Sequence, residues 1–505
     1  MFADVAIVGA GPVGLFLANQ LQRRGLRYRL LEKRDTRQLE GTAVMLWPRT
    51  LEIFDQMGIL PEVLECSLTL KARNVTQDGR LLVGTELNAA GHGYTHVSIR
   101  DIDLEEILER ELGRRGGIIQ WSSTVTGLER NFSGVEVEWT TTGTTHRVQC
   151  RYLVGCDGPD SFVRRRLGVS FSGDGCQESL LTGQVELNCG RSHSELWKLM
   201  GPGKLARLLP IPGRAGRYRI ECILAAGSGE EELEPGLCQS LLPPNCEVRG
   251  IWPEGRHQLT QQLAERYRVG NCFLAGQAAH PQLPSDGLAL DTGLQDAFNL
   301  GWKLAAVLRG EALDSLLESY HEERHAAGRQ ALDFCLARWR EQREQSPGNP
   351  GYAGGIGYAQ SRLAGGTLPE GQRGAAAGDR LDFIGDLTSP ALGAPARLIE
   401  FLRHGDLQLI GFGGAWEELT LLAEHLKSVL GNQFHSLAIA SPTDPPPPEG
   451  LLCLLDPQNR ARQTWGEGCG AMLVRPDGHV GWRGRPARDE YLDGFLAQVS
   501  LDLLP

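Results

Sequence analysis

The sequence predicts an α/β protein built around a parallel sheet, and two observations support this fold class. The first is a strand–turn–helix–strand pattern at the N-terminus, where the apolar segments Asp4–Val8 and Tyr28–Leu31 flank a helical run. The second is the return of buried-strand patterns at Tyr152–Gly155 and Val269–Ala275, each followed by a turn and a helix. Strands that alternate with helices in this way form a parallel sheet with crossover connections. With 505 residues the chain exceeds one ordinary core, so we expect two or three domains.

The glycine-rich segment after the first strand has the spacing of a dinucleotide-binding turn. Gly9 permits the tight turn, Gly11 lets a pyrophosphate approach the backbone, and Gly14 lets the helix pack closely on the strand. The helix N-terminus attracts phosphates, and Glu32 ends the second strand where it can accept hydrogen bonds from ribose hydroxyls. The sequence therefore predicts an ADP-binding βαβ unit, with a purely structural turn as the alternative.

Composition argues against several classes of protein. The net charge of −11 gives no electrostatic support for nucleic-acid binding. No apolar stretch approaches the ~20 residues that a membrane span needs, and residues 1–4 carry no basic segment of the signal-peptide type. We therefore expect a cytoplasmic protein without nucleic-acid or membrane partners. The 12 cysteines include no C-x-x-C pair, which favours buried apolar side chains over a metal or thiol-redox site.

Changes in composition and pattern divide the chain into four parts. Residues 1–180 and 266–345 form a discontinuous nucleotide-binding domain, and residues 181–265 predict an inserted antiparallel sheet that forms a wall over a pocket. Residues 346–380 are a glycine-rich linker or wrapping loop, and residues 381–505 form a small α/β domain. Helices are expected at 51–57, 103–114, 290–308, 315–343, 416–430 and 491–499. Strands are expected at 117–121, 135–140, 181–187, 205–210, 218–225, 269–275, 407–412, 436–440 and 471–474.

Three motifs resemble those of the single-component (group A) FAD-dependent aromatic hydroxylases, a family that includes phenol hydroxylase and polyketide hydroxylases. They are the turn Gly9–Gly14, the pair Asp157–Gly158, and the stretch Gly276–His280 with the helix that follows it. The resemblance covers essentially the whole chain. It implies a Rossmann-like FAD-binding domain of the glutathione-reductase type, an inserted antiparallel β-sheet substrate domain and a C-terminal thioredoxin-like domain. The segment Val474–Gly478 belongs to that last domain, whose implied role is packing or dimerisation because no redox cysteine pair is present there.

The resemblance also implies a set of cofactor contacts. The glycine turn and its acid would hold the ADP half of FAD, the Asp-Gly pair would contact FAD and NADPH, and the later helix would direct its N-terminus at the flavin. Arg49 would support a phosphate or form only an ion pair. The cofactor-binding candidates are Gly9, Gly11, Gly14, Glu32, Arg49, Asp157, Gly158, Gly276, Gln277 and Gly287. The implied cofactors are FAD and, for a redox-active protein, NADPH or NADH; no metal is implied.

The sequence departs from the family pattern where the reactive end of the flavin would lie. Gln277 stands where the family has Asp, Thr42 where it usually has Arg, and Asp101 where it has Gln. Asp286 and Asp291 add negative charge near a flavin that becomes anionic on reduction. At ~5 Å and an effective dielectric of about 20, each pair of like charges costs ~3 kcal/mol. The motifs for the adenine end are thus retained, and those for the reactive end are altered.

Three functions compete on these residues. In the first, an FAD- and NAD(P)H-dependent monooxygenase hydroxylates an apolar, ring-bearing molecule of the aromatic or polyketide type. In the second, a flavin-free or flavin-inert relative performs dehydration, cyclisation or ring opening, with buried groups as acids and bases. Those catalytic candidates are Asp101, His280, Asp286 and Asp291. The third is a non-catalytic binding protein, and nothing in the sequence decides between a monomer and a homodimer.

Each catalytic candidate also has a structural alternative. His280 would pack beside the end of a strand, Asp291 would cap the helix that starts nearby, and Asp286 would be a turn residue. Asp101 would pair with Arg100 or cap the helix that follows it. The sequence leaves these alternatives open.

Overall fold

The computed structural model describes residues 2–87, 93–173, 175–190, 192–202, 204–225, 232–260, 262–281, 288–343, 357–366, 368, 373–390 and 393–500. The chain divides into two compact units. The first contains Met1–Phe54, Ile59–Ala297 and Gly328–Asn349, and the second contains Asp55–Gly58, Phe298–Ala327 and Pro350–Pro505. None of the described helices is long and apolar enough to cross a membrane.

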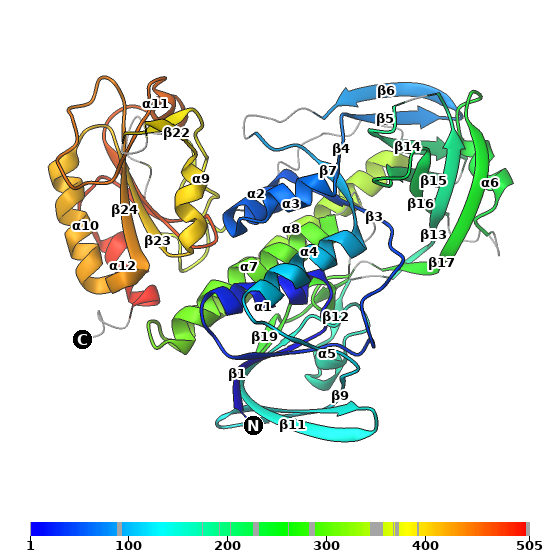
Figure 1. Cartoon of the computed structure of the whole chain (residues 1–505), viewed down its shortest axis with the longest axis horizontal. Helices are drawn as coiled ribbons and strands as arrows, with labels where there is room; N and C mark the ends of the chain where they lie inside the picture. Colours follow the sequence, from blue (N-terminus) through cyan, green and yellow to red (C-terminus); the bar gives the residue numbers. More distant parts are fainter. Residues whose placement is uncertain are drawn as a thin grey trace. The chain divides into compact units, whose positions relative to one another are not determined.

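The main sheet of the first unit confirms the predicted α/β fold. Its strand order is β19–β20–β11–β1–β2–β8, and β1, β2, β8, β11 and β20 run parallel (Figure 1). These strands are β1 (Phe2–Val8), β2 (Tyr28–Leu31), β8 (Ile119–Gln120), β11 (Thr144–Gly155), β19 (Arg268–Val269) and β20 (Cys272–Leu274). Helix α1 (Pro12–Arg23) connects β1 to β2 and packs on α4 (Asp101–Arg114). Because the strands are parallel, the segments that follow them meet at one edge of the sheet.

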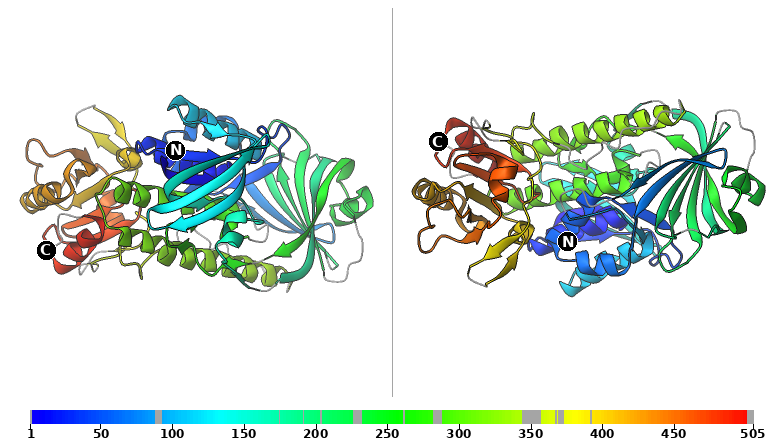
Figure 2. Two further views of the ribbon diagram at one scale, coloured as in Figure 1. Left: turned by 90° about the horizontal axis from the view of Figure 1, so that it is seen from below. Right: turned by 90° about the horizontal axis from the view of Figure 1, so that it is seen from above.

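A second sheet of the first unit has the order β17–β13–β16–β15–β14–β5–β6. Its strands are β5 (Ala72–Gln77), β6 (Arg80–Glu86), β13 (Gly175–Asn188), β14 (Glu195–Gly201), β15 (Lys204–Pro210), β16 (Arg217–Leu224) and β17 (Glu247–Thr260). Figure 2 shows the blue strands β5 and β6 beside the green ones, although they come from far earlier in the chain. Helix α6 (Pro235–Leu241) shares an apolar core with this sheet. The sheet thus extends beyond residues 181–265, and the four-part domain division stays a prediction.

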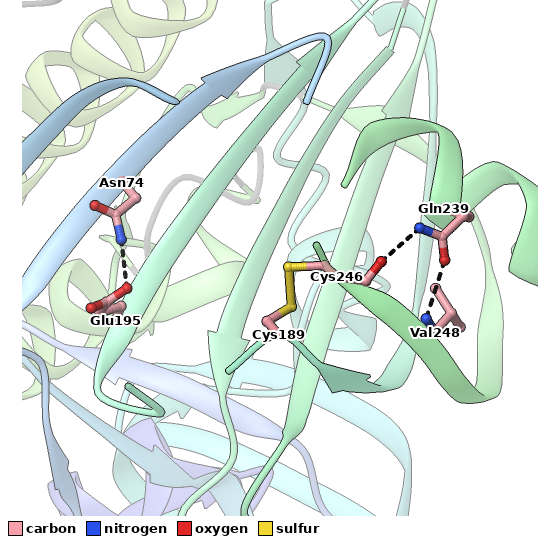
Figure 3. The surroundings of a disulfide bond; sticks show 6 residues. All are labelled: Asn74, Cys189, Glu195, Gln239, Cys246 and Val248. Carbon is pink, nitrogen blue, oxygen red and sulfur yellow. Dashed lines mark hydrogen bonds between the residues drawn. A yellow bond between two sulfur atoms is a disulfide. The ribbon is translucent and has the colours of Figure 1, made fainter. Parts of the chain in front are cut away.

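A disulfide joins Cys189 and Cys246 in this sheet (Figure 3). The two cysteines follow and precede the paired residues Asn188 and Glu247, at the ends of neighbouring strands β13 and β17, and their Cα atoms lie 4.1 Å apart. The expectation that the cysteines are only buried apolar side chains is therefore wrong for this pair. Strand register brings the two together, and their sequence separation of 57 residues gives no signal of it.

The second unit contains a seven-stranded sheet of order β22–β21–β25–β24–β23–β26–β27. Its strands are β21 (Leu387–Ser389), β22 (Ala394–Ala396), β23 (Leu407–Phe412), β24 (Phe434–Ala440), β25 (Cys453–Leu455), β26 (Gly470–Val474) and β27 (Val480–Gly484). Its helices include α9 (Leu398–Phe401), α10 (Trp416–Leu430), α11 (Arg460–Trp465) and α12 (Glu490–Val499). The strands and helices expected between 407 and 499 are thus present.

A fully buried network of charged side chains connects the segment after β26 to Lys303 of α7 and Glu323 of α8 within the second unit. Arg475 pairs with Glu323 at 2.7 Å and with Asp477 at 2.6 Å, and Lys303 pairs with the same Glu323 at 2.7 Å. Trp302 donates its indole N–H to Asp477 at 3.1 Å. Burial lowers the pKa of Lys303 to about 8, while the Glu323 carboxylate opposes that shift. Arg475 and Asp477 thus pack within their own unit.

Several of the predicted elements begin or end elsewhere. Helix α7 (Leu288–Leu308) begins two residues before the expected start, and α8 (Glu318–Arg343) follows a short 3-10 turn, Asp314–Leu317. The expected strand 269–275 is interrupted because Gly270 adopts a positive φ of 59° between β19 and β20. The remaining described elements of the first 300 residues are β3 (Ala43–Leu46), α2 (Pro48–Met57), α3 (Leu60–Glu65), β4 (Leu68–Thr69), β7 (Val97–Arg100), β9 (Thr124–Asn131), β10 (Gly134–Thr141), α5 (Phe162–Arg166), β12 (Phe171–Ser172), β18 (Leu263–Ala264) and the 3-10 helix Gly276–Ala278.

Candidate functional site

The three motifs singled out in the sequence meet at the carboxyl edge of the main sheet. A Cβ atom on Gly9 would lie 2.5 Å from the carbonyl oxygen of Cys156, which ties the first turn to the segment after β11. A Cβ atom on Gly276 would lie 3.1 Å from Val13, and one on Gly293 would lie 2.8 Å from the same side chain. Val13, at the start of α1, therefore packs against both the segment after β20 and the helix α7.

The glycine turn has the shape that a pyrophosphate site requires. Gly9 adopts a positive φ of 97°, and a Cβ atom on Gly14 would lie 1.9 Å from the Gly9 carbonyl oxygen, so neither position tolerates a side chain. A Cβ atom on Gly11, by contrast, would have no described atom within 4 Å. Gly11 is also the N-cap of α1 and provides no side-chain cap. The turn thus presents open space in front of a helix N-terminus, where anions bind.

Glu32 fastens this turn to the end of β2. Its buried carboxylate accepts a hydrogen bond from the backbone N–H of Ala10 at 2.7 Å and from that of Arg34 at 3.0 Å. The Arg34 guanidinium lies 3.2 Å from the same carboxylate and 3.3 Å from Glu105. Glu32 therefore has a structural task besides the predicted contact with ribose. Together with the open space at Gly11, these residues fit the ADP half of FAD.

Asp157 uses its carboxylate to order the start of helix α5. It accepts hydrogen bonds from the hydroxyl of Ser161 at 2.5 Å and from the backbone N–H of Val163 at 3.1 Å. Gly158 has a positive φ of 80°, which permits the chain to turn between β11 and this helix. The Asp-Gly pair is thus held beside the glycine turn, and its predicted contacts with FAD and NADPH stay predictions.

Asp101 is placed differently from both structural alternatives. Its Oδ1 atom accepts the backbone N–H groups of Thr42 at 2.9 Å and Ile102 at 2.8 Å, whereas Arg100 pairs with Asp103 at 2.6 Å. Burial raises the pKa of the Asp101 carboxyl, and the two backbone donors oppose this. The buried hydroxyl of Thr42 has no hydrogen-bond partner among the described residues.

His280 is held by a second carboxylate of the same unit. The Oδ2 atom of Asp296 lies 2.6 Å from His280 Nε2 and accepts the backbone N–H of Gly276 at 3.0 Å. Both side chains are fully buried, whereas Gln277 is exposed. The arrangement corresponds to the packing role considered for His280, because the ring fixes the segment after β20. Sequence reasoning placed Asp296 on the flavin-directed helix but could not identify its two partners.

Asp291 lies inside helix α7 rather than at its cap. It is the fourth residue of the helix, is 1% exposed, and accepts hydrogen bonds from the hydroxyl of Thr50 and from Gln295 Nε2 at 2.6 Å. The expectation that Asp291 caps the helix is therefore wrong, because the helix begins at Leu288. Arg49 forms a buried ion pair with Glu52 at 3.1 Å, and its support of a phosphate stays a prediction. The candidates Asp286 and Gly287 lie outside the described residues.

The second sheet also contains a cluster of charged side chains that the sequence pattern alone did not predict. Arg207 and Arg219 lie on either side of Glu221, with Arg219 at 3.0 Å and Arg207 in direct contact. Arg219 also donates to the carbonyl oxygen of Ala43 at 3.0 Å, which connects this sheet to β3. Arg219 and Glu221 are two residues apart on β16, whereas Arg207 lies on β15 and meets Glu221 through the strand register.

Comparison with known proteins gives consistent matches. A family model described as "FAD binding domain" matches residues 2–335. Rifampicin monooxygenase from Streptomyces venezuelae is 34% identical over 345 residues, which are 66% of this chain and 71% of that protein. Dialkyldecalin synthase from Streptomyces rugosporus is 32% identical over 347 residues, 67% of this chain and 73% of that protein. The crystal structure of aklavinone-11 hydroxylase with FAD and aklavinone superposes with a TM-score of 0.82 at 24% identity, covering 99% of both chains.

Proposed function

The chain belongs to the family of FAD-dependent aromatic and polyketide hydroxylases, and from this premise we propose that it hydroxylates an apolar, ring-bearing molecule of the polyketide type with a reduced nicotinamide as electron donor. The observation that carries the proposal is the convergence of the three motif segments around Val13 and Cys156. These segments are far apart in sequence, and the space left at Gly11 matches the approach of a pyrophosphate.

The residues of this edge have distinct tasks in the proposal. The glycine turn and Glu32 bind the adenine dinucleotide half, while Asp296 orients the segment that contains Gln277 through Gly276 and His280. When bound, FAD supplies the redox chemistry, which comprises electron transfer from the nicotinamide and activation of dioxygen. The protein supplies binding, orientation and exclusion of water. His280 is a positioning residue in this assignment, because its ring nitrogen is engaged by Asp296.

An absorption spectrum and an oxygen electrode test the proposal. We expect the purified full-length protein, incubated with FAD and freed of excess by gel filtration, to retain the flavin absorption bands. It should then consume NADPH or NADH and dioxygen in equal amounts when a polycyclic phenol is added, with a mass gain of one oxygen atom in the product. Protein that retains no flavin, or consumes no dioxygen with any member of a phenol panel, would contradict the monooxygenase assignment.

A second candidate is non-redox ring formation, because a relative named dialkyldecalin synthase matches as large a share of the chain as the monooxygenase does. The exposed Gln277, which replaces the family Asp, agrees with a flavin that is bound but not used for oxidation. Turnover of a linear polyene without nicotinamide or dioxygen would support this candidate. A strict requirement for both co-substrates would exclude it.

A further inference from the structure

Arg219 reaches from the second sheet to the first residue of β3. Its neighbours in β16, Tyr218 and Ile220, belong to the apolar core that this sheet shares with α6, so Arg219 points to the opposite face of the sheet. There it donates a hydrogen bond to the carbonyl oxygen of Ala43 at 3.0 Å, and it lies 3.0 Å from Glu221. The guanidinium is thus fixed where the second sheet meets the three-stranded sheet β3–β7–β4.

Two buried polar atoms beside this Arg219–Ala43 contact have no hydrogen-bond partner among the described residues. One is Nε of Arg219 itself, and the other is the hydroxyl oxygen of Thr42, the residue before Ala43. Native proteins leave few buried polar atoms unsatisfied, because such atoms have lost water without gaining another partner. Their coincidence beside one hydrogen bond indicates that a polar group binds at this contact in the functional protein.

The same contact is connected to the dinucleotide site through the first turn of α4. Asp101, which begins α4, accepts the backbone N–H of Thr42 at 2.9 Å. Glu105, one turn further along α4, lies 3.3 Å from Arg34, and Arg34 lies 3.2 Å from Glu32. One helical turn, about 5.4 Å along the axis, therefore separates the residue that holds Thr42 from the residue that reaches the ADP site. The flavin half of a dinucleotide bound at the glycine turn is the polar group that this position can receive.

The charges at this contact favour an electron-rich group. The Glu221 carboxylate contacts both Arg219 and Arg207, so two guanidiniums share one carboxylate and these three side chains keep a net positive charge. Burial raises the pKa of the Asp101 carboxyl, and its two backbone donors and the Arg219 charge oppose this rise. The Asp101 carboxylate would repel a flavin ring that becomes anionic on reduction, and Arg219 offsets that repulsion.

We propose that Arg219 donates its Nε–H to an oxygen of the flavin half of FAD and stabilises the negative charge that the ring carries after reduction. This assignment rests on the FAD binding of the proposed function, and it makes a residue of the second sheet part of the cofactor site. Arg207 provides the matched control, because it contacts the same Glu221 from the neighbouring strand β15.

Calorimetric titration of the full-length apoprotein with oxidised FAD and, without oxygen, with dithionite-reduced FAD tests this role. At mildly alkaline pH, Arg219→Gln should raise the dissociation constant of oxidised FAD about fivefold and that of reduced FAD at least about fiftyfold. Arg219→Lys keeps the charge and should bring the ratio of the two constants to within about threefold of the wild-type ratio. Arg207→Gln removes a guanidinium from the same Glu221 and should leave both constants within about threefold of the wild type. Circular dichroism of each variant confirms that it is folded.

An Arg219→Gln variant that binds both redox forms of FAD as the wild type does would overturn the role of Arg219 and leave the proposed function intact. Equal losses of affinity in Arg219→Gln and Arg207→Gln would also overturn it, because both arginines would then act through Glu221 on the sheet. A rise in the KM of a phenol with unchanged FAD affinities would assign Arg219 to the substrate instead. A wild-type protein that binds neither form of FAD would contradict the proposed function itself.

Discussion

The turn after β1 and the segment after β20 lie at the same edge of one sheet but are held by different forces. Steric fit determines the path of the first segment. Because Gly9 and Gly14 have no side chains, Gly14 can pack on the Gly9 backbone, and Gly9 can pack on the backbone of Cys156. Charge determines the second, since the Asp296 carboxylate binds both Gly276 and His280. At Gly9 and Gly14 the turn tolerates no added atom. A segment held by one carboxylate tolerates substitution at exposed positions such as Gln277, because these side chains do not fix its backbone conformation.

The largest effect is expected from Gly14→Ala. The added Cβ atom would lie 1.9 Å from a backbone carbonyl oxygen, which cannot move as a flexible side chain would. We expect a loss of at least about 3 kcal/mol of stability, or no folded protein, because overpacking of backbone has no cheap relief. Urea unfolding, with FAD retention after gel filtration, measures both consequences.

Gly11→Ala is the matched control for that change. Its Cβ atom would meet no described atom, so the free energy of unfolding should change by less than about 1 kcal/mol. FAD retention should nevertheless fall, because the added methyl group occupies the approach of the pyrophosphate. Equal losses of stability in the two variants would contradict the distinction between a packed and an open glycine.

The next effect tests the segment held by charge. Asp296→Ala leaves the backbone N–H of Gly276 and the ring of His280 without the carboxylate that they share. Each buried polar group that loses its partner costs about 1–3 kcal/mol, so we expect a total loss of about 2–6 kcal/mol in urea unfolding. Asp296→Asn retains one acceptor oxygen and should lose clearly less. If Asp296→Asn lost no stability at all, hydrogen bonding alone, rather than the negative charge, would hold the segment.

The same distinction explains what the sequence could predict. The glycine turn is predictable because each glycine acts through local sterics that its spacing already encodes. Strand β23 (Leu407–Phe412) and helix α10 (Trp416–Leu430) match their expected limits, because their apolar periodicity is local. In both cases the information lies within a few consecutive residues.

Features that depend on distant pairing were not predictable. The hairpin β5–β6 joins a sheet whose other strands begin about a hundred residues later in the chain. No local sequence pattern indicates that β5 pairs with β14. The disulfide between Cys189 and Cys246 depends on the register of β13 and β17. Asp296 lies on the predicted helix, but its hydrogen bond with His280 forms only because folding brings the two residues together.

A smaller effect is expected at the exposed position of the charge-held segment. Gln277→Asp restores the residue of the family motif, and its exposure should keep the free energy of unfolding within about 0.5 kcal/mol of the wild type. If this side chain binds the ribitol, a charged acceptor should tighten FAD binding by up to about tenfold. Titration of FAD followed by quenching of its fluorescence measures the affinity. Gln277→Ala should weaken binding, and unchanged affinity in both variants would place the ribitol elsewhere.

The smallest effect is expected from Asp101→Asn and concerns pH. Burial raises the pKa of the Asp101 carboxyl, so the folded protein holds this proton more tightly than the unfolded chain does. The resulting stabilisation is complete below the unfolded pKa, near 3.9, and is lost as pH rises through the folded pKa. At pH 7 the charged, buried form therefore destabilises the wild type. Asn avoids this penalty and keeps the oxygen that accepts from Thr42 and Ile102.

Urea unfolding of wild type and Asp101→Asn at several pH values measures this difference. The variant should be the more stable protein at about pH 7. The difference in free energy of unfolding should disappear at about pH 3, where the Asp101 carboxyl of the wild type is protonated in both the folded and the unfolded state. A gap that stays constant with pH would show that the substitution acts through packing rather than through ionisation. A variant less stable than the wild type at neutral pH would mean that the Asp101 charge is stabilised by an interaction stronger than its desolvation, as in the charge-held segment around Asp296.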